Sequence, residues 1–230
     1  MGIKYKVNEN FFDRWNAIMA YVLGYWYADG SMYFSARGSY INVTSIDKDT
    51  IYKIKKWLDS HHTIREAEPI WSNGKIRYTL RIGNKSLYKS LLKLGLYPSK
   101  SLSIQLPNVP NKFLNHFVRG YFDGDGCVYI YIKKGKTQER ILGGLTTTFT
   151  SGSKMFLDSL CQRLKFRLEL NRDKVYKGHR SFQLKYNTAD SMKIFNFMYL
   201  GCQPDLYLKR KFEIFKHYFS LSKKYGAVAK

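Results

Sequence analysis

Two stretches of this 230-residue chain, VLGYWYADG at residues 22–30 and VRGYFDGDG at residues 118–126, are versions of one pattern. In register, Gly24 aligns with Gly120 and Asp29 aligns with Asp125, at a constant offset of 96 residues. Self-similarity at a fixed offset indicates that the chain is built from two similar halves.

The segments that follow each copy also agree in order. After each copy comes an alternating stretch typical of a β-hairpin, residues 32–46 in the first half and 128–150 in the second. A helix follows each hairpin, at residues 50–60 with Asp47 as its cap and at 155–164 with Ser151 as its cap. Second hairpins that turn at 72–74 and near 177–178, and short helices at 87–94 and 191–200, complete the two halves.

The predicted fold is therefore α+β, with two pseudo-symmetric αββαββα halves whose sheets are antiparallel. We expect the first half to span 12–106 and the second 107–220, because Pro107 and Pro110 mark a joint between them. The tail after Phe219 is expected to be frayed.

Small residues recur four apart in the repeated segment, which makes one helix face almost smooth. Such a face lets two helix backbones approach closely. A glycine inside a helix costs about 0.5–1 kcal/mol relative to alanine, so its repetition suggests a packing role. We expect the two helices to pack on each other about a pseudo-twofold axis through Ala20, Gly24 and Ala28 in one copy and His116, Gly120 and Gly124 in the other.

This pairing predicts that Asp29 and Asp125 lie close together at the same end of the two helices. A helix C-terminus disfavours a carboxylate, and two carboxylates disfavour each other. A divalent cation would relieve the repulsion. The plainer alternative is that each Asp-Gly pair ends a helix, with Gly30 and Gly126 in a left-handed cap.

Charge points to a polyanionic partner. The chain has 39 basic and 17 acidic residues, a net charge of +22, and both halves share the excess. Such a surface favours nucleic acid, although a merely solvated basic surface is the alternative. Three scattered cysteines and five histidines without metal-site spacing support neither a disulfide framework nor a zinc site.

The sequence also gives expectations about location. No apolar signal segment or membrane-spanning stretch is found, so we expect a protein that is not secreted and has no membrane partner. An intracellular, reducing compartment is expected, either the cytoplasm with its nucleoid or an organelle matrix.

Residues 22–30 and 118–126 resemble the two signature motifs of LAGLIDADG homing endonucleases of the two-motif, single-chain type. The duplicated G-x-x-x-x-D-G and the repeated element order carry the resemblance, over roughly residues 12–219. The sequence departs from the family pattern at Tyr27 (for an acidic residue), Arg119 (for a small residue) and Gly124 (for an alanine).

The resemblance implies an endonuclease for double-stranded DNA, with saddle-shaped sheets in the major groove. It implies catalytic Asp29 and Asp125 as metal ligands, usually for Mg²⁺, with Mn²⁺ as another divalent ion and Ca²⁺ as a non-catalytic substitute. Lys100 and Lys211 match the basic residues that the family places near each scissile phosphate. The implied products have 5′ phosphates and staggered 3′ ends.

Polar strand faces would read the DNA, since Arg, Asn and Gln can read base edges while Lys and Thr more often hold phosphates. The predicted DNA-binding residues of the first half are Tyr33, Ser35, Arg37, Tyr40, Asn42, Arg77, Thr79 and Arg81. Those of the second half are Tyr129, Tyr131, Lys133, Lys134, Gln138, Arg140, Thr146, Thr148, Arg167, Asn171, Arg172, Gln183 and Lys185. Two unequal faces predict a monomer that recognises a long, asymmetric target.

Three other functions remain open from the sequence. One is an intron maturase that binds intron RNA on the same scaffold, and another is a DNA-binding protein that does not cleave. The third is a basic structural protein, for which the paired Asp-Gly motifs would have no purpose.

Overall fold

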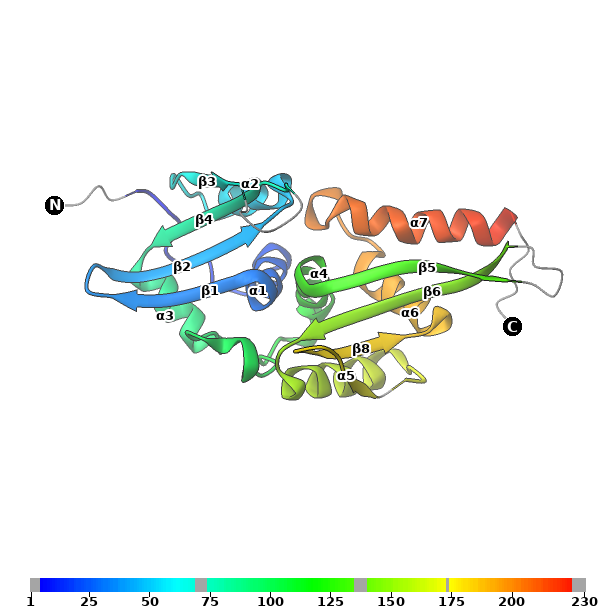
Figure 1. The fold of residues 1–230 in the computed structure, drawn as a ribbon. Helices are drawn as coiled ribbons and strands as arrows, with labels where there is room; N and C mark the ends of the chain where they lie inside the picture. The colour runs from blue at the N-terminus through cyan, green and yellow to red at the C-terminus, as the bar shows by residue number, and fades with distance from the viewer. Residues whose placement is uncertain (1–4, 69–73, 135–139, 173, 225–230) are drawn as a thin grey trace. The chain divides into compact units, whose positions relative to one another are not determined.

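The computed structural model describes residues 5–68, 74–134, 140–172 and 174–224. The chain forms two compact units. Unit 1 comprises residues 1–100 and 107–124, and unit 2 comprises residues 101–106 and 125–230. Each unit contains one four-stranded antiparallel sheet, so the predicted α+β class with two αββαββα repeats is confirmed (Figure 1).

Unit 1 holds the first repeat together with the helix that opens the second repeat. Its elements are α1 (Ala17–Asp29), β1 (Gly30–Ser35), β2 (Gly38–Ser45), α2 (Lys48–Trp57), β3 (Ile64–Ala67), β4 (Arg77–Gly83), α3 (Lys85–Lys93), the short 3-10 helix η2 (Asn111–Phe113) and α4 (Leu114–Asp125), whose last residue belongs to unit 2. A further short 3-10 helix, η1 (Lys100–Leu102), begins at the end of unit 1.

The sheet of unit 1 has the strand order β1-β2-β4-β3. Met32 on β1 pairs with Ile41 on β2, which in turn pairs with Ile82 on β4. These three side chains are buried, and α1, α2 and α3 pack against the sheet. Since successive strand residues point to opposite faces, the polar residues between them form the other face. We call this the open face of unit 1.

Unit 2 repeats the plan. Its elements are β5 (Gly126–Lys134), β6 (Arg140–Ser151), α5 (Lys154–Leu168), β7 (Val175–Lys177), β8 (Phe182–Tyr186), α6 (Thr188–Tyr199), the short 3-10 helix η3 (Pro204–Leu206) and α7 (Lys209–Lys224). The strand order β5-β6-β8-β7 matches that of the first sheet. The register shifts at Tyr131/Ile132, where Gly143 is the extra residue of a β-bulge.

The helix α1 is buried almost all round. Asn16 caps its N-terminus, with its side-chain oxygen accepting from the backbone N–H of Met19 at 2.9 Å. Every residue from Met19 to Tyr27 is buried, so the helix has no solvent-facing stripe. Packing on all sides fixes the helix end that carries Asp29.

The glycines of α1 and α4 meet in a reciprocal contact. A Cβ on Gly24 would overlap the carbonyl oxygen of Phe117, and a Cβ on Gly120 would overlap the carbonyl oxygen of Tyr21. These are equivalent pairs of the repeat, because residues 21 and 117 share the offset of 24 and 120. The predicted pairing of the two helices through small residues is therefore confirmed.

The α7 helix was not predicted from the sequence. Phe195 of α6 contacts Phe212, Phe215 and Phe219 of α7, with ring centroids 5.8, 5.1 and 4.8 Å apart. Aromatic side chains three and four residues apart lie on one helix face, and this stripe anchors the helix beside β5 and β6 (Figure 1). The expectation of a frayed tail from Phe219 is wrong as far as Lys224.

The cap expected at Ser151 is wrong, and so are the left-handed caps at Gly30 and Gly126. The cap of α5 is Ser153, whose side chain accepts from the N–H of Phe156, and not Ser151. Gly30 is extended (φ −86°, ψ 150°), and Gly126 has no positive φ either. Glycine is needed at position 30 for space, because a Cβ there would lie 2.7 Å from Cγ of Trp26.

Within the part of the chain that the structure describes, no helix is both long enough and apolar enough to cross a bilayer.

Candidate functional site

Asp29 is the last residue of α1 and is only partly buried. Its Oδ2 lies 3.3 Å from the position that a Cβ would occupy on Gly124, and its Cγ lies 3.5 Å from that position. Asp125 follows Gly124 directly in the chain, ends α4 and is also partly buried. A side chain at position 124 would therefore crowd the Asp29 carboxylate.

Lys100 is brought to the end of α1 within unit 1. Although it is a lysine, it is only 6% exposed. Its Nζ donates to the carbonyl oxygen of Tyr27 at 2.7 Å and to that of Ala28 at 3.5 Å. The last carbonyls of a helix have no partner inside it, and a cation there is stabilised by the helix dipole. The ammonium therefore lies on the backbone immediately before Asp29.

Lys211 has the matching place in unit 2. It is 4% exposed, and its Nζ donates to the carbonyl oxygen of Gly126 at 2.6 Å. Its neighbours Lys209 and Arg210 are both exposed. Each unit thus places one predicted lysine on the backbone beside its predicted aspartate.

A buried polar group joins α1 to α4 near this site. The Tyr21 hydroxyl donates to Oδ2 of Asp123 at 2.7 Å, and both residues are almost fully buried. Arg119 has no exposed surface, and its guanidinium lies 5.7 Å from the Tyr21 ring. Arg119 also bonds to Nδ1 of His116 at 2.7 Å. The sequence did not single out Tyr21 or Asp123.

The pKa values of this group follow its burial. Desolvation, reinforced by the charge of Asp123, raises the pKa of the Tyr21 hydroxyl well above its usual value. Burial, together with the Arg119 guanidinium, lowers the pKa of His116 to about 4. His116 is therefore a neutral acceptor for Arg119 at neutral pH, and Tyr21 is a donor.

Most predicted DNA-binding residues of the first half share the open face of unit 1. Strand pairing places Tyr33 opposite Tyr40, and Asn42 opposite Arg81. Arg37 lies in the exposed turn between β1 and β2. The same alternation puts residues on this face that were not predicted to bind DNA, among them Arg65 on β3, the first strand of the predicted second hairpin. The residues with polar side chains on this face are Ser31, Tyr33, Ser35, Tyr40, Asn42, Thr44, Arg65, Arg77, Thr79 and Arg81.

The second sheet has its own open face. The predicted residues on it are Tyr129, Tyr131, Lys133, Thr146, Thr148, Gln183 and Lys185, and it also carries Cys127, Thr150 and Tyr176. A hollow of about 380 Å³ on this side is lined by Tyr129, Tyr131, Thr146, Arg172, Lys185, Tyr186 and Asn187. Arg172 donates to the Tyr176 hydroxyl at 3.4 Å.

Several predicted residues of the second half lie elsewhere. Lys134 follows Lys133 in β5, so the alternation turns it to the opposite face, where Ile132 lies. Arg167 is in the last turn of α5, a helix that packs against β6, β7 and β8. The N–H and the side-chain amide of Asn171 both donate to Asp190, which holds this residue in a loop.

The remaining predicted residues of the second half are Thr148, Arg140 and Gln138. Thr148 is only 5% exposed although its strand position belongs to the open face, so a ligand could not reach its hydroxyl without movement. Arg140 begins β6. Gln138 lies outside the described residues.

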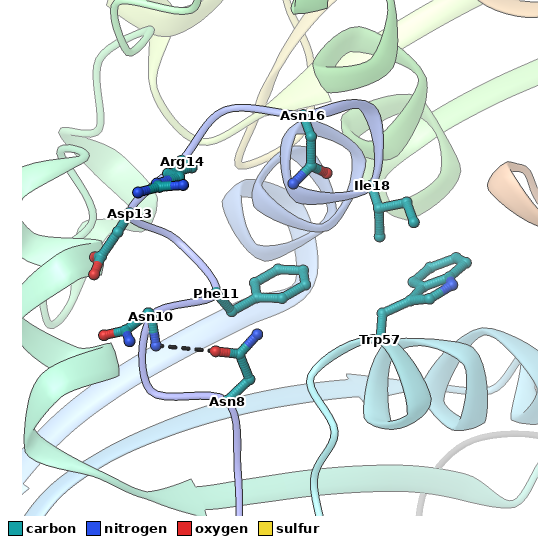
Figure 2. Close-up of a pocket in the computed structure, with 8 residues that line it drawn as sticks. All are labelled: Asn8, Asn10, Phe11, Asp13, Arg14, Asn16, Ile18 and Trp57. Carbon is teal, nitrogen blue, oxygen red and sulfur yellow. Dashed lines mark hydrogen bonds between the residues drawn. The ribbon is translucent and has the colours of Figure 1, made fainter.

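A cavity of about 690 Å³ lies elsewhere in unit 1, and its lining residues are drawn in Figure 2: Asn8, Asn10, Phe11, Asp13, Arg14, Asn16, Ile18 and Trp57. Oδ1 of Asn8 accepts from the N–H of Asn10 at 3.2 Å, and Asn16 is occupied in capping α1. The cavity lies at the N-terminal end of α1, whereas Asp29 and Lys100 lie at the C-terminal end. It is therefore not part of the candidate site.

A family model described as the LAGLIDADG-like domain matches residues 16–95 and again residues 112–197. The chain belongs to this family. The matched segments are the two structural repeats, so residues 22–30 and 118–126 are its two LAGLIDADG motifs, and α1 and α4 are its LAGLIDADG helices.

Solved structures show the same fold. The LAGLIDADG meganuclease I-AabMI, bound to uncleaved DNA, aligns with a TM-score of 0.61 at 14% identity, over 93% of this chain and 92% of that one. I-SmaMI, bound to an uncleaved DNA target in the presence of calcium ions, aligns with a TM-score of 0.61 at 14% identity, over 94% and 95%. The homing endonuclease I-LtrWI, bound to target DNA, gives 0.59 at 14% identity, over 94% and 92%. No curated protein sequence matches the chain.

Proposed function

We propose that this LAGLIDADG protein is a site-specific endonuclease that hydrolyses both strands of a DNA duplex with the help of divalent metal. The observation that carries the proposal is the duplicated helix end: an aspartate closes each LAGLIDADG helix, and a buried lysine binds the backbone beside it. The family match and the DNA-bound relatives support the same function.

The residues fit a magnesium site of the kind that is completed by substrate. Among the described residues, no three acidic, histidine or cysteine side chains gather as a metal cage. Mg²⁺ is usually held by one or two carboxylates together with waters and substrate phosphates, so Asp29 and Asp125 would suffice as protein ligands. A bound divalent ion would lower the pKa of water and neutralise the charge on the phosphoryl group.

The chain's own residues have three roles in this proposal. Asp29 and Asp125 hold the metal, and the packed α1 keeps the first of them in place. Lys100 and Lys211 put a positive charge beside each aspartate, where it would stabilise the scissile phosphate. The open faces of the two sheets bind the target, and because their sequences differ, the target is long and asymmetric.

We further propose that the protein acts as a monomer, since one chain carries both repeats. The products would be 5′ phosphates and staggered 3′ ends. Mn²⁺ would replace Mg²⁺, whereas Ca²⁺ would support binding without cleavage.

The test is selection of cleaved sites from a randomised duplex library by the purified protein in Mg²⁺. We expect one long asymmetric site. Asp29→Asn and Asp125→Asn should each lower the cleavage rate by at least about 10³-fold, since a lost metal contact costs several kcal/mol. Binding should survive in both variants and should fall by about 10³–10⁵ between 50 and 200 mM salt if roughly six to ten phosphates are contacted. Cleavage by the double variant at the wild-type rate would overturn the proposal.

A further inference from the structure

Three side chains on the open face of unit 1 form a stacked group. Tyr33 on β1 lies directly opposite Tyr40 on β2, and their rings stack with centroids 5.0 Å apart at an interplanar angle of 17°. The guanidinium carbon of Arg81, on β4, lies 4.4 Å from the centroid of the Tyr40 ring and 5.1 Å from that of Tyr33. A cation over two aromatic faces is held by cation–π attraction.

Gly83 creates the room for this stack. It is the β4 residue opposite Tyr40, two positions from Arg81 on the same face. A Cβ on Gly83 would lie 3.0 Å from Cε1 and 3.3 Å from Cδ1 of Tyr40, tighter than an ordinary contact. The Tyr40 ring therefore lies over bare backbone and reaches the guanidinium of Arg81.

The hydrogen-bonding edge of Arg81 is available. Among the described residues, no hydrogen bond or ion pair to its guanidinium is found. The five N–H donors of arginine lie in the plane of the group. The two rings do not use these donors, which stay available to a ligand, and the rings reduce the rotamer freedom that binding would otherwise remove.

The position within the sheet indicates which ligand this is. With the order β1-β2-β4-β3, both β2 and β4 are inner strands, so Arg81 stands in the middle of the open face and away from its margins. A duplex against this face would present base edges at the centre of its groove and phosphates at the sides. The pair of acceptors that matches the arginine fork in a major groove is O6 and N7 of guanine.

We propose that Arg81, oriented by Tyr33 and Tyr40, reads one guanine in the half of the target that faces the first sheet. The inference rests on the proposed function, because it requires a DNA target. It assigns Arg81 a base contact and gives the two tyrosines a positioning role.

The test compares the sites selected from a randomised duplex library by the wild-type protein and by variants. Wild type should require guanine at one position of this half-site. Arg81→Lys keeps the charge but loses the fork, so we expect the preference for guanine at that single position to fall by about 5- to 100-fold. Preferences at the other positions should stay the same.

Two further variants test whether the loss of the guanine preference is specific to Arg81 and its aromatic stack. Arg77→Lys changes an exposed arginine on the same strand and face, and it should leave the guanine preference at the Arg81 position intact. Gly83→Ala keeps Arg81 but displaces the Tyr40 ring, and it should lower that preference by an intermediate factor. Circular dichroism and thermal melting check that each variant is folded.

The outcomes separate the two proposals. Weaker binding by Arg81→Lys to all sequences alike, with base preferences unchanged, would show a phosphate contact and overturn the guanine assignment while leaving the endonuclease in place. Absence of any selected site with the wild-type protein would overturn the proposed function itself, and the guanine contact with it.

Discussion

The hydrogen bond between Tyr21 and Asp123 should be among the stronger single contributions to the α1–α4 contact. Its 2.7 Å length and the burial of both residues, which are 2% and 1% exposed, indicate a bond to a carboxylate shielded from water. A hydrogen bond to a charged group contributes about 1.5–3 kcal/mol, against about 0.5–1.5 kcal/mol for a neutral pair. We therefore expect Tyr21→Phe to lower the free energy of unfolding by about 2 kcal/mol.

The same helix offers a matched control. The hydroxyl of Tyr25, one turn along α1, donates to the neutral hydroxyl of Ser45 at 2.9 Å, and its ring is equally buried. Tyr25→Phe removes the same atom, so it should cost only about 1 kcal/mol. The assay is urea unfolding followed by tyrosine and tryptophan fluorescence, with the midpoint and the slope fitted for each variant.

A double-mutant cycle completes the test. Tyr21→Phe combined with Asp123→Asn should cost less than the sum of the single changes, because both remove the same bond. If Tyr21→Phe proved no more destabilising than Tyr25→Phe, or if the two changes added fully, the carboxylate at Asp123 would not stabilise α1 in the way that the geometry indicates.

Three further predictions concern the same helices. Gly120→Ala should lower the free energy of unfolding by about 1–3 kcal/mol, because the new Cβ meets the backbone of Tyr21. Alanine has the better helix propensity, so a gain in stability on urea unfolding would contradict the close contact. Lys100→Met should lower the rate at which one DNA strand is cut by at least about 10²-fold, while the other strand is still nicked. Denaturing gels would separate the two products, and an equal loss on both strands would refute a role confined to one scissile phosphate. The pKa of His116, held near 4 by burial and by Arg119, lies below its usual 6.5, so the unfolded chain takes up the proton first. The free energy of unfolding should therefore fall as the pH drops from about 6.5 to about 4, more steeply than in His116→Gln, and identical pH profiles would contradict this.

The fold could be predicted wherever apolar or small residues recur at strand or helix spacing. Strands with buried residues at every second position and helices with spaced small residues follow from local geometry, so the hairpins and the contact through Gly24 and Gly120 could be predicted. The pairing of β2 with β4, which sets the strand order, is non-local and was not predicted. The α7 helix was not predicted, because it follows the last element of the repeated αββαββα order; its aromatic stripe at Phe212, Phe215 and Phe219 does have helical spacing.

The candidate site was only partly predictable. Asp29 and Lys100 were named from the motifs, but that a lysine would be buried on the carbonyl of Tyr27 depends on a contact across 73 positions of the chain, which no local pattern contains. The same holds for Tyr21 and Asp123, 102 positions apart. Lys134 was misplaced because β5 continues as far as this residue, and within a strand it lies on the opposite face from Lys133.

The reciprocal glycine contact also limits where the chain could be divided into separately produced fragments. Residues 107–124 open the second repeat in sequence but group with unit 1 in space, so a fragment that stopped at residue 106 would leave Gly24 and the apolar flank of α1 facing water. Because each copy offers the other the same surface, such a fragment would associate with a second molecule of itself, as self-complementary surfaces do. A fragment that ended after Gly124 would keep the α4 backbone that covers Gly24, so this contact places the division one helix later than the internal duplication suggests.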